Sequence, residues 1–339
     1  MIMGRRSLRR KKIILVGAAL FGLLAFFYAS LFLNWGRRSN QIYGVSFDPV
    51  YARYLGIDSG KAYYEALIRD WGFRYIRLSA HWDTVENQRG QYDFSDLDWY
   101  VNRAAEAGAK ITLAIGQKTP RWPECHEPEW AKKLPAAENR AALLNYITAV
   151  VEHYRVWPGI ELWQVENEPF LDFGECHAFG VKDLKEEITL VKRLDSAHPT
   201  ITTDSGELSL WWKTARAADY FGATMYRTVW DKMFGYFTYR FLPSGWYPAR
   251  AFFMGRDLNT AFVMELQAEP WSPGKPITSV PLAEQYQSMN RERLQENIEY
   301  AKRSGFPRVY LWGAEWWYWL QKKGYNEIPD YVKTLPKGN

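Results

Sequence analysis

Two glutamates in this sequence lie where strand-like apolar runs end, and this placement suits acid and nucleophile chemistry. Glu168 follows the run at 160–167, and Glu265 lies near the end of the run at 261–266. Two carboxyl groups roughly 5 Å apart can cleave a glycosidic bond with retention, because one protonates the leaving group while the other, ionised, attacks the anomeric carbon. The pair is a candidate for this chemistry if the fold brings the two strand ends together.

Each of the two glutamates has a neighbouring glutamate that offers an alternative. Glu166 precedes Glu168 by two residues, and Glu269 follows Glu265 by four. Glu265 directly continues the apolar run FVM, whereas Glu269 lies in the AEPW loop. We therefore expect Glu265, rather than Glu269, to be the nucleophile.

Eight short apolar runs are available to position these residues. The predicted strands are 41–48, 73–80, 110–116, 160–167, 200–204, 219–226, 261–266 and 308–314. Helical patterns separate several of them, notably 95–108, 139–155 and 282–305. Alternating strands and helices indicate a parallel sheet with helical crossovers, and eight strands favour a single closed (β/α)8 barrel, or TIM barrel. Active sites of such barrels lie at the carboxyl ends of the strands, where Glu168 and Glu265 are expected.

The segment 227–258 is the least regular part of this pattern, with ten aromatic residues. Three interpretations stay open for it: an excursion that lines the substrate site, a patch that rests on a membrane, or a helix with a large hydrophobic face.

The string WQVENEP places the triplet Asn167-Glu168-Pro169 at the end of the predicted fourth strand. With the other strands in place, the chain resembles glycoside hydrolase clan A, the retaining (β/α)8 glycosidases that include cellulase-like and β-galactosidase-like families. The resemblance covers most of residues 41–320. It implies that Glu168 is the acid/base, that Glu265 is the nucleophile, and that Asn167 binds the sugar 2-hydroxyl.

Three other residues match positions of the clan. Arg77 resembles the strand-two arginine that hydrogen-bonds the nucleophile, although a surface salt bridge is the alternative role. Tyr226 resembles the tyrosine or histidine near the nucleophile, with a buried structural role as the alternative. Trp312 resembles the tryptophan under the reacting sugar, although three further tryptophans follow within seven residues.

Three residues in loops at the catalytic end are weaker candidates for sugar contacts. They are His81, Gln117 and Trp122, and a purely structural role is an equal alternative for each. The string that begins at His81, HWDTVENQRGQYDFSDLD, resembles the β-galactosidase-like families and marks the fold rather than the chemistry.

The two cysteines, Cys125 and Cys176, are too few for a dense disulfide framework or an iron–sulfur cluster. Each precedes a histidine, so a zinc site with His126 and His177 is an alternative, but its spacing fits no common zinc finger. We favour a disulfide, because loops after adjacent parallel strands lie at the same end of a barrel.

The N-terminal region differs in composition from the rest of the chain. Residues 13–33 contain no charge and would span roughly 30 Å as a helix, about the thickness of a bilayer core. Six basic residues precede this run and two follow it, so the positive-inside rule predicts a cytoplasmic N-terminus. A cleaved signal peptide is the alternative.

We therefore predict a basic cytoplasmic tail (1–12), a transmembrane signal anchor (13–35) and an extracytoplasmic catalytic domain (39–339). Residues 1–38 hold eight basic and no acidic residues, which leaves 35 basic and 38 acidic residues in the remainder. A mildly acidic domain is poorly suited to nucleic acid.

The expected function is retaining hydrolysis, by double displacement, of β-linked extracytoplasmic glycosides or polysaccharides, with no metal or cofactor. A transglycosylase, a catalytically silent carbohydrate-binding barrel and an envelope scaffold are the alternatives. The oligomeric state, the sugar and the mode of cleavage are not predicted.

Overall fold

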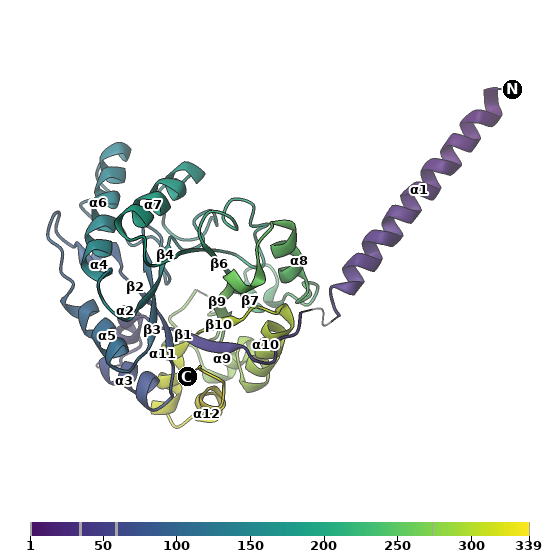
Figure 1. Ribbon diagram of the computed structural model, residues 1–339. Helices are drawn as coiled ribbons and strands as arrows, with labels where there is room; N and C mark the ends of the chain where they lie inside the picture. The colour runs from purple at the N-terminus through teal and green to yellow at the C-terminus, as the bar shows by residue number, and fades with distance from the viewer. Residues whose placement is uncertain (1, 34–35, 58–59, 273, 339) are drawn as a thin grey trace.

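The structure is a computed structural model that describes residues 2–33, 36–57, 60–272 and 274–338. Its centre is a closed barrel of eight parallel strands (Figure 1). In order around the barrel they are β1 (Ile42–Ser46), β2 (Tyr75–Ser79), β3 (Lys110–Ile115), β4 (Ile160–Val165), β5 (Thr200–Asp204), β6 (Tyr220–Met225), β9 (Ala261–Gln267) and β10 (Arg308–Trp312). Each predicted strand has its counterpart here, and the predicted barrel is confirmed.

Helices on the outside connect most of the successive strands. The longer ones are α3 (Gly60–Arg69), α5 (Ser95–Glu106), α6 (Ala136–Tyr154), α7 (Val181–Leu194) and α10 (Arg291–Ser304). Shorter ones are α2 (Pro49–Tyr54), α4 (Trp82–Val85), α8 (Trp246–Phe253), α9 (Leu282–Ser288), α11 (Ala314–Lys322) and α12 (Glu327–Lys333). Between β5 and β6, residues 205–219 form turns in place of a helix.

The helical pattern predicted over 282–305 is divided in the structure into α9 and α10. Met289 ends α9 with extended backbone (φ −150°, ψ 109°). The side chain of Asn290 then accepts a hydrogen bond from the backbone N of Arg293 at 2.9 Å and so caps a new helix. α10 ends before Gly305, whose φ of 78° is the left-handed conformation that favours glycine.

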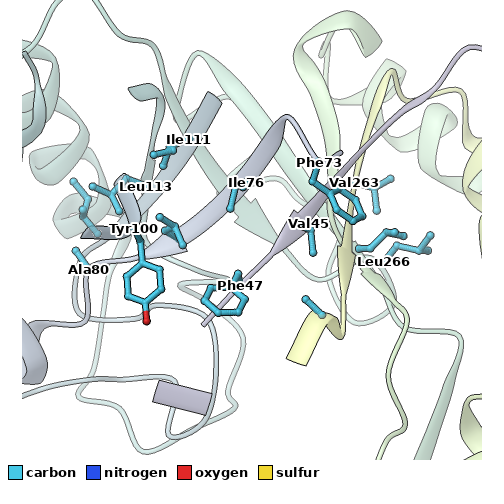
Figure 2. Close-up of a cluster of buried hydrophobic side chains, with 14 of the residues drawn as sticks. Val45, Phe47, Phe73, Ile76, Ala80, Tyr100, Ile111, Leu113, Val263 and Leu266 are labelled. Carbon is cyan, nitrogen blue, oxygen red and sulfur yellow. The ribbon is translucent and has the colours of Figure 1, made fainter. Parts of the chain in front are cut away.

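Apolar side chains on the two faces of the barrel strands form two separate cores. The outer core, between strands and helices, includes Val45, Ile76, Leu113 and Val263 (Figure 2). The inner core is smaller and consists of Leu162, Ile201, Phe262, Met264 and Tyr310. Three of them, Leu162, Ile201 and Met264, precede Gln164, Thr203 and Glu265 on their strands, so polar side chains of these strands lie toward the carboxyl ends.

The segment after β6 forms an antiparallel hairpin followed by α8. The hairpin strands are β7 (Thr228–Asp231) and β8 (Gly235–Thr238). Gln267, on β9, accepts hydrogen bonds at 2.9 Å from the backbone N atoms of both Arg227 and Thr228. This side chain therefore fixes the base of the hairpin beside the barrel.

The N-terminal helix α1 (Ile2–Ser30) projects away from the barrel, and its C-terminal end lies next to α8 (Figure 1). Its portion Lys12–Ser30 has a mean hydropathy of 2.3 and is long and apolar enough to cross a membrane. By length and composition, α1 is thus a candidate transmembrane helix.

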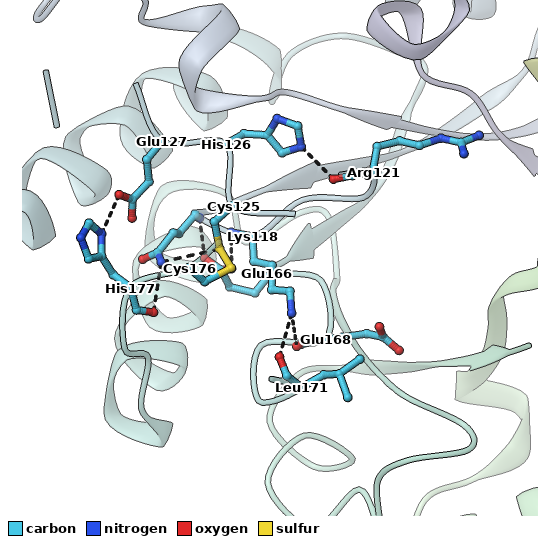
Figure 3. Close-up of a disulfide and its surroundings, with 11 residues drawn as sticks. Lys118, Arg121, Cys125, His126, Glu127, Glu166, Glu168, Leu171, Cys176 and His177 are labelled. Carbon is cyan, nitrogen blue, oxygen red and sulfur yellow. Dashed lines mark hydrogen bonds and ion pairs between the residues drawn. A yellow bond between two sulfur atoms is a disulfide. The ribbon is translucent and has the colours of Figure 1, made fainter. Parts of the chain in front are cut away.

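A disulfide joins Cys125, after β3, to Cys176, after β4, with a Cα–Cα distance of 5.2 Å (Figure 3). The neighbouring histidines are engaged elsewhere. His126 is hydrogen-bonded to the carbonyl of Arg121 at 3.0 Å, and His177 to Glu127 at 2.6 Å. With the two sulfur atoms bonded to each other, this arrangement does not form the alternative zinc site.

We expect the variant Cys125→Ser to lower the free energy of unfolding by about 2–4 kcal/mol, because the crosslink closes a long loop and restricts the unfolded chain. Urea unfolding of the detergent-solubilised full chain measures this loss. Cys176→Ser and the double variant should lose the same amount. Two free thiols in non-reduced protein from an oxidising compartment, detected by mass spectrometry, would contradict the pairing.

Candidate active site

Glu265 is buried in the barrel mouth, where two side chains donate hydrogen bonds to its carboxylate. Nη1 of Arg77 donates to Oε1 at 2.6 Å, and the hydroxyl of Tyr226 donates to Oε2 at 2.7 Å. Arg77, on β2, is itself only 1% exposed. A positive charge and a hydroxyl donor both stabilise the ionised form of a carboxylate.

An irregularity in β9 turns Glu265 toward the interior of the barrel. Val263 and Leu266 both belong to the outer core, whereas the adjacent Met264 and Glu265 both face inward. The pairing of β9 shifts its register at this point against both β6 and β10. Regular alternation would send Met264 and Glu265 to opposite faces, and a bulge is the local distortion that re-aims a side chain.

Arg77 also orients the polar residues at the end of β4. Its Nη2 donates to Oδ1 of Asn167 at 2.8 Å, and its Nε donates to Oε1 of Gln164 at 2.6 Å. Oδ1 of Asn167 accepts a further hydrogen bond from the hydroxyl of Thr203 at 2.8 Å. The oxygen of the Asn167 amide is therefore held within the protein.

Glu168 occupies a different electrostatic environment from that of Glu265. The hydroxyl of Thr224 donates to Oε1 of Glu168 at 2.8 Å, and Thr203 accepts from its backbone N at 2.9 Å. Burial, and then the negative charge of Glu265, raise the pKa of Glu168 well above its ordinary value. This carboxyl group therefore retains its proton at pH values where an exposed glutamate is ionised.

Glu124 is a third carboxyl group at this site, and it was not among the residues predicted from the sequence. Burial, followed by the charge of Glu265, raises the pKa of Glu124 to about 7. Glu124 also adds to the negative charge that raises the pKa of Glu168. Its position next to Cys125, in a loop after a barrel strand, was the available sequence signal.

The two alternative glutamates both have structural partners. Glu166 accepts the backbone N–H groups of Gln117 and Lys118 at 2.6 and 2.7 Å, and so ties the end of β4 to the end of β3. Glu269 forms an ion pair with Arg121 at 2.5 Å. These contacts give Glu166 and Glu269 roles in holding loops together.

Trp312 ends β10 at the barrel mouth, but the guanidinium of Arg121 lies over its ring at 4.0 Å. Arg121 also lies over the ring of Tyr51 at 3.8 Å and pairs with Glu315 at 2.6 Å. A cavity of only about 10 Å³ adjoins Arg77, Arg121 and Trp312, which is about the space for one water. Arg121 was not among the residues predicted from the sequence, although it lies directly beside Trp122.

The three weaker candidates for sugar contacts differ in how far their side chains are engaged by other residues. Both ring nitrogens of His81 are engaged, with Asp48 at 2.6 Å and Thr119 at 2.7 Å. Gln117 is buried, and its side-chain amide donates to the carbonyl of His177 at 3.4 Å. Trp122, by contrast, is 62% exposed, with the ring of Phe173 in an edge-to-face contact at 5.9 Å.

Comparison with known proteins is consistent with this geometry. Residues 58–187 match the family described as Glycosyl hydrolase family 10, a segment that includes Arg77, Asn167 and Glu168. The chain is 29% identical over 143 residues to "Endo-1,4-beta-xylanase A" of Phanerodontia chrysosporium, which covers 42% of this chain and 29% of that protein. The match therefore spans less than a third of the length of that relative.

Two solved structures show the same fold at low sequence identity. A glycosylated endo-β-1,4-xylanase of Gloeophyllum trabeum is 14% identical, with a TM-score of 0.56 over 81% of this chain and 84% of that one. A β-galactosidase of Halorubrum lacusprofundi is 15% identical, with a TM-score of 0.53 over 80% of this chain and 52% of that one.

The family match and the xylanase relative each cover less than half of this chain. Together with the closed parallel barrel, they fit a clan A (β/α)8 glycosidase, as the resemblance drawn from the sequence had predicted.

Proposed function

We propose that this protein is a retaining glycoside hydrolase that acts by double displacement, with Glu265 as nucleophile and Glu168 as general acid/base. The observation that carries the proposal is the contrast between the two carboxyl groups. Glu265 receives hydrogen bonds from Arg77 and Tyr226, which favour a carboxylate, while the raised pKa of Glu168 favours the protonated acid.

In the first step, an oxygen of Glu265 attacks the anomeric carbon while the bond to the leaving group breaks. Glu168 gives its proton to the departing oxygen. In the second step, Glu168 takes a proton from water, whose oxygen replaces Glu265 at the anomeric carbon. Asn167, held by Arg77 and Thr203, is placed to bind the sugar hydroxyl next to that carbon.

The proposed substrate is a β-linked glycoside or polysaccharide. The printed name of the relative, an endo-1,4-beta-xylanase, supports a β linkage. The exposed ring of Trp122 is the candidate platform for a sugar face, because flat aromatic rings pack well against apolar surfaces. Trp312 stays a candidate for the floor of the site, with Arg121 placed over its ring.

We also propose that α1 anchors the protein in a membrane, with residues 1–12 cytoplasmic and residues 39–339 outside. The apolar length of α1 and the six-to-two excess of basic residues before it support this orientation. The disulfide between Cys125 and Cys176 agrees with an oxidising compartment.

The variant Glu265→Gly should lose hydrolysis and leave a cavity beside the anomeric carbon. Azide can enter this cavity and attack, so we expect a glycosyl azide of inverted configuration, identified by NMR. Glu269→Gln is the matched control and should give no azide product. Undiminished turnover by Glu265→Gly would instead move the nucleophile to another residue.

The variant Glu168→Ala should slow cleavage of substrates with poor leaving groups by about 100- to 10,000-fold, because no acid protonates them. Substrates with good leaving groups should still form the glycosyl-enzyme, which azide then resolves with retained configuration. In the parent, kcat/KM should fall as rising pH removes the proton of Glu168, and this alkaline limb should vanish in the variant with activated substrates. An inverted azide product would show that the two roles are exchanged.

Protease added to intact cells or spheroplasts should remove the barrel and spare the N-terminal tail, because the barrel is expected outside. Immunoblots against each end of the chain measure the result, with a cytoplasmic protein as the control for intact cells. A protected barrel would overturn the orientation, and a mature N-terminus near residue 30 would show that α1 is cleaved.

A further inference from the structure

Five large apolar side chains are exposed on the hairpin β7–β8 and around α8. They are Met233 (81% exposed), Phe234 (72%), Phe241 (58%), Phe252 (79%) and Phe253 (61%), and they are called the apolar patch below. Exposed apolar surface of this kind on a folded domain marks an interaction site.

The end of α1 packs directly against the apolar patch. The ring of Phe27 lies 6.3 Å from that of Phe253, in an edge-to-face arrangement. The hydroxyl of Tyr28 donates to the carbonyl of Phe241. The backbone N of Gly245, just before α8, donates to the carbonyl of Leu31 at 3.1 Å, and a Cβ at Gly245 would collide with that carbonyl.

Ring contacts extend this association along the hairpin and along α8. Phe237 lies 6.4 Å from Phe234 on one side and 6.1 Å from Phe241 on the other. Phe253 lies 5.7 Å from Phe252. The aromatic surface is therefore continuous with α1, and α8 lies beside the base of α1 in Figure 1.

The contact between Phe27 and Phe253 indicates the depth of the apolar patch relative to the membrane that α1 would span. Phe27 lies inside the candidate span, three residues before its end at Ser30, or about 4.5 Å along a helix. A side chain that touches Phe27 is therefore level with the boundary between hydrocarbon and headgroups. Aromatic side chains concentrate at this boundary, and amphipathic surface helices bury their apolar faces there to about 5–10 Å.

Contacts of residues 37 and 38, which follow α1 in the chain, keep the barrel close to α1. The backbone N of Arg38 donates to the carbonyl of Lys302 at 3.0 Å, and Arg37 pairs with Glu299 at 2.9 Å. The chain is thus bound to the barrel at Leu31 and again at residues 37–38. Exposed Lys232 and Arg240 flank the patch and suit anionic headgroups.

We propose that the apolar patch inserts into the extracytoplasmic face of the same bilayer that α1 spans. The barrel then lies on the membrane surface and is not connected to the membrane by α1 alone. This inference rests on the proposed anchoring by α1 and is independent of the glycosidase chemistry. Of the three interpretations left open for segment 227–258, it selects the membrane-resting patch.

The test uses the full chain in nanodiscs of phosphatidylethanolamine and phosphatidylglycerol, with one nitroxide label at a time. The labels replace Phe252→Cys and Phe234→Cys, and the native cysteines are bonded to each other and do not react. Val156→Cys, 78% exposed, matches the exposure of Phe252, while Leu20→Cys reports on α1. Electron paramagnetic resonance then compares collisions with oxygen, which enters lipid, and with a water-soluble nickel complex.

We expect the labels at 252 and 234 to collide with the nickel complex several-fold less, and with oxygen more, than the label at 156. If the label at 20 lies in lipid but those at 252 and 234 match the label at 156, the patch proposal is overturned while anchoring stands. A water-exposed label at 20 overturns the anchoring itself. The spectrum of the label at 252 can also show dipolar broadening that disappears when each nanodisc holds one chain. That result would show that a second copy covers the patch, and it also overturns the proposal.

Discussion

The guanidinium of Arg77 is a positive charge buried inside the barrel, and the arrangement of the site depends on it. A buried charge costs several kcal/mol unless it is paired and fully hydrogen-bonded, and removing one partner of a buried pair costs about 3–5 kcal/mol. Its partners, Glu265, Asn167 and Gln164, come from the ends of β4 and β9. The requirement to satisfy one arginine thus draws together residues from three strands at the barrel mouth.

The same charge distribution separates the two candidate catalytic groups. Glu265 receives the positive charge of Arg77 and the hydroxyl of Tyr226. The carboxyl group of Glu168 receives the neutral hydroxyl of Thr224, and the negative charge of Glu265 outweighs the positive charge of Lys118 there. Glu124 adds further negative charge. Two chemically identical side chains therefore lie in contrasting surroundings, with a buried arginine beside Glu265 and a raised pKa for Glu168.

The segment after β6 connects this site with the outer surface of the molecule. Its first residues are held by Gln267, two positions beyond Glu265 on β9. Its aromatic residues continue outward to the end of α1. A single excursion from the barrel therefore lies beside β9, the strand that carries Glu265, and also carries the exposed apolar surface next to the candidate transmembrane helix.

The sequence alone determined the barrel. Its strands are buried between the outer helices and the barrel interior, so each strand appears in the sequence as a short apolar run. The spacing of these runs along the chain can be read without knowledge of tertiary contacts. It also identified Glu168 and Glu265 as residues that end such runs. Only the tertiary structure decided the direction of Glu265, since the bulge in β9 arises from pairing with β6 and β10 and breaks the alternation that a sequence shows. Arg121 and Glu124 were missed for a related reason: Arg121 pairs with Glu315, 194 residues away, and Glu124 gains its environment from Glu265. Such contacts join distant parts of the chain, and no local pattern records them.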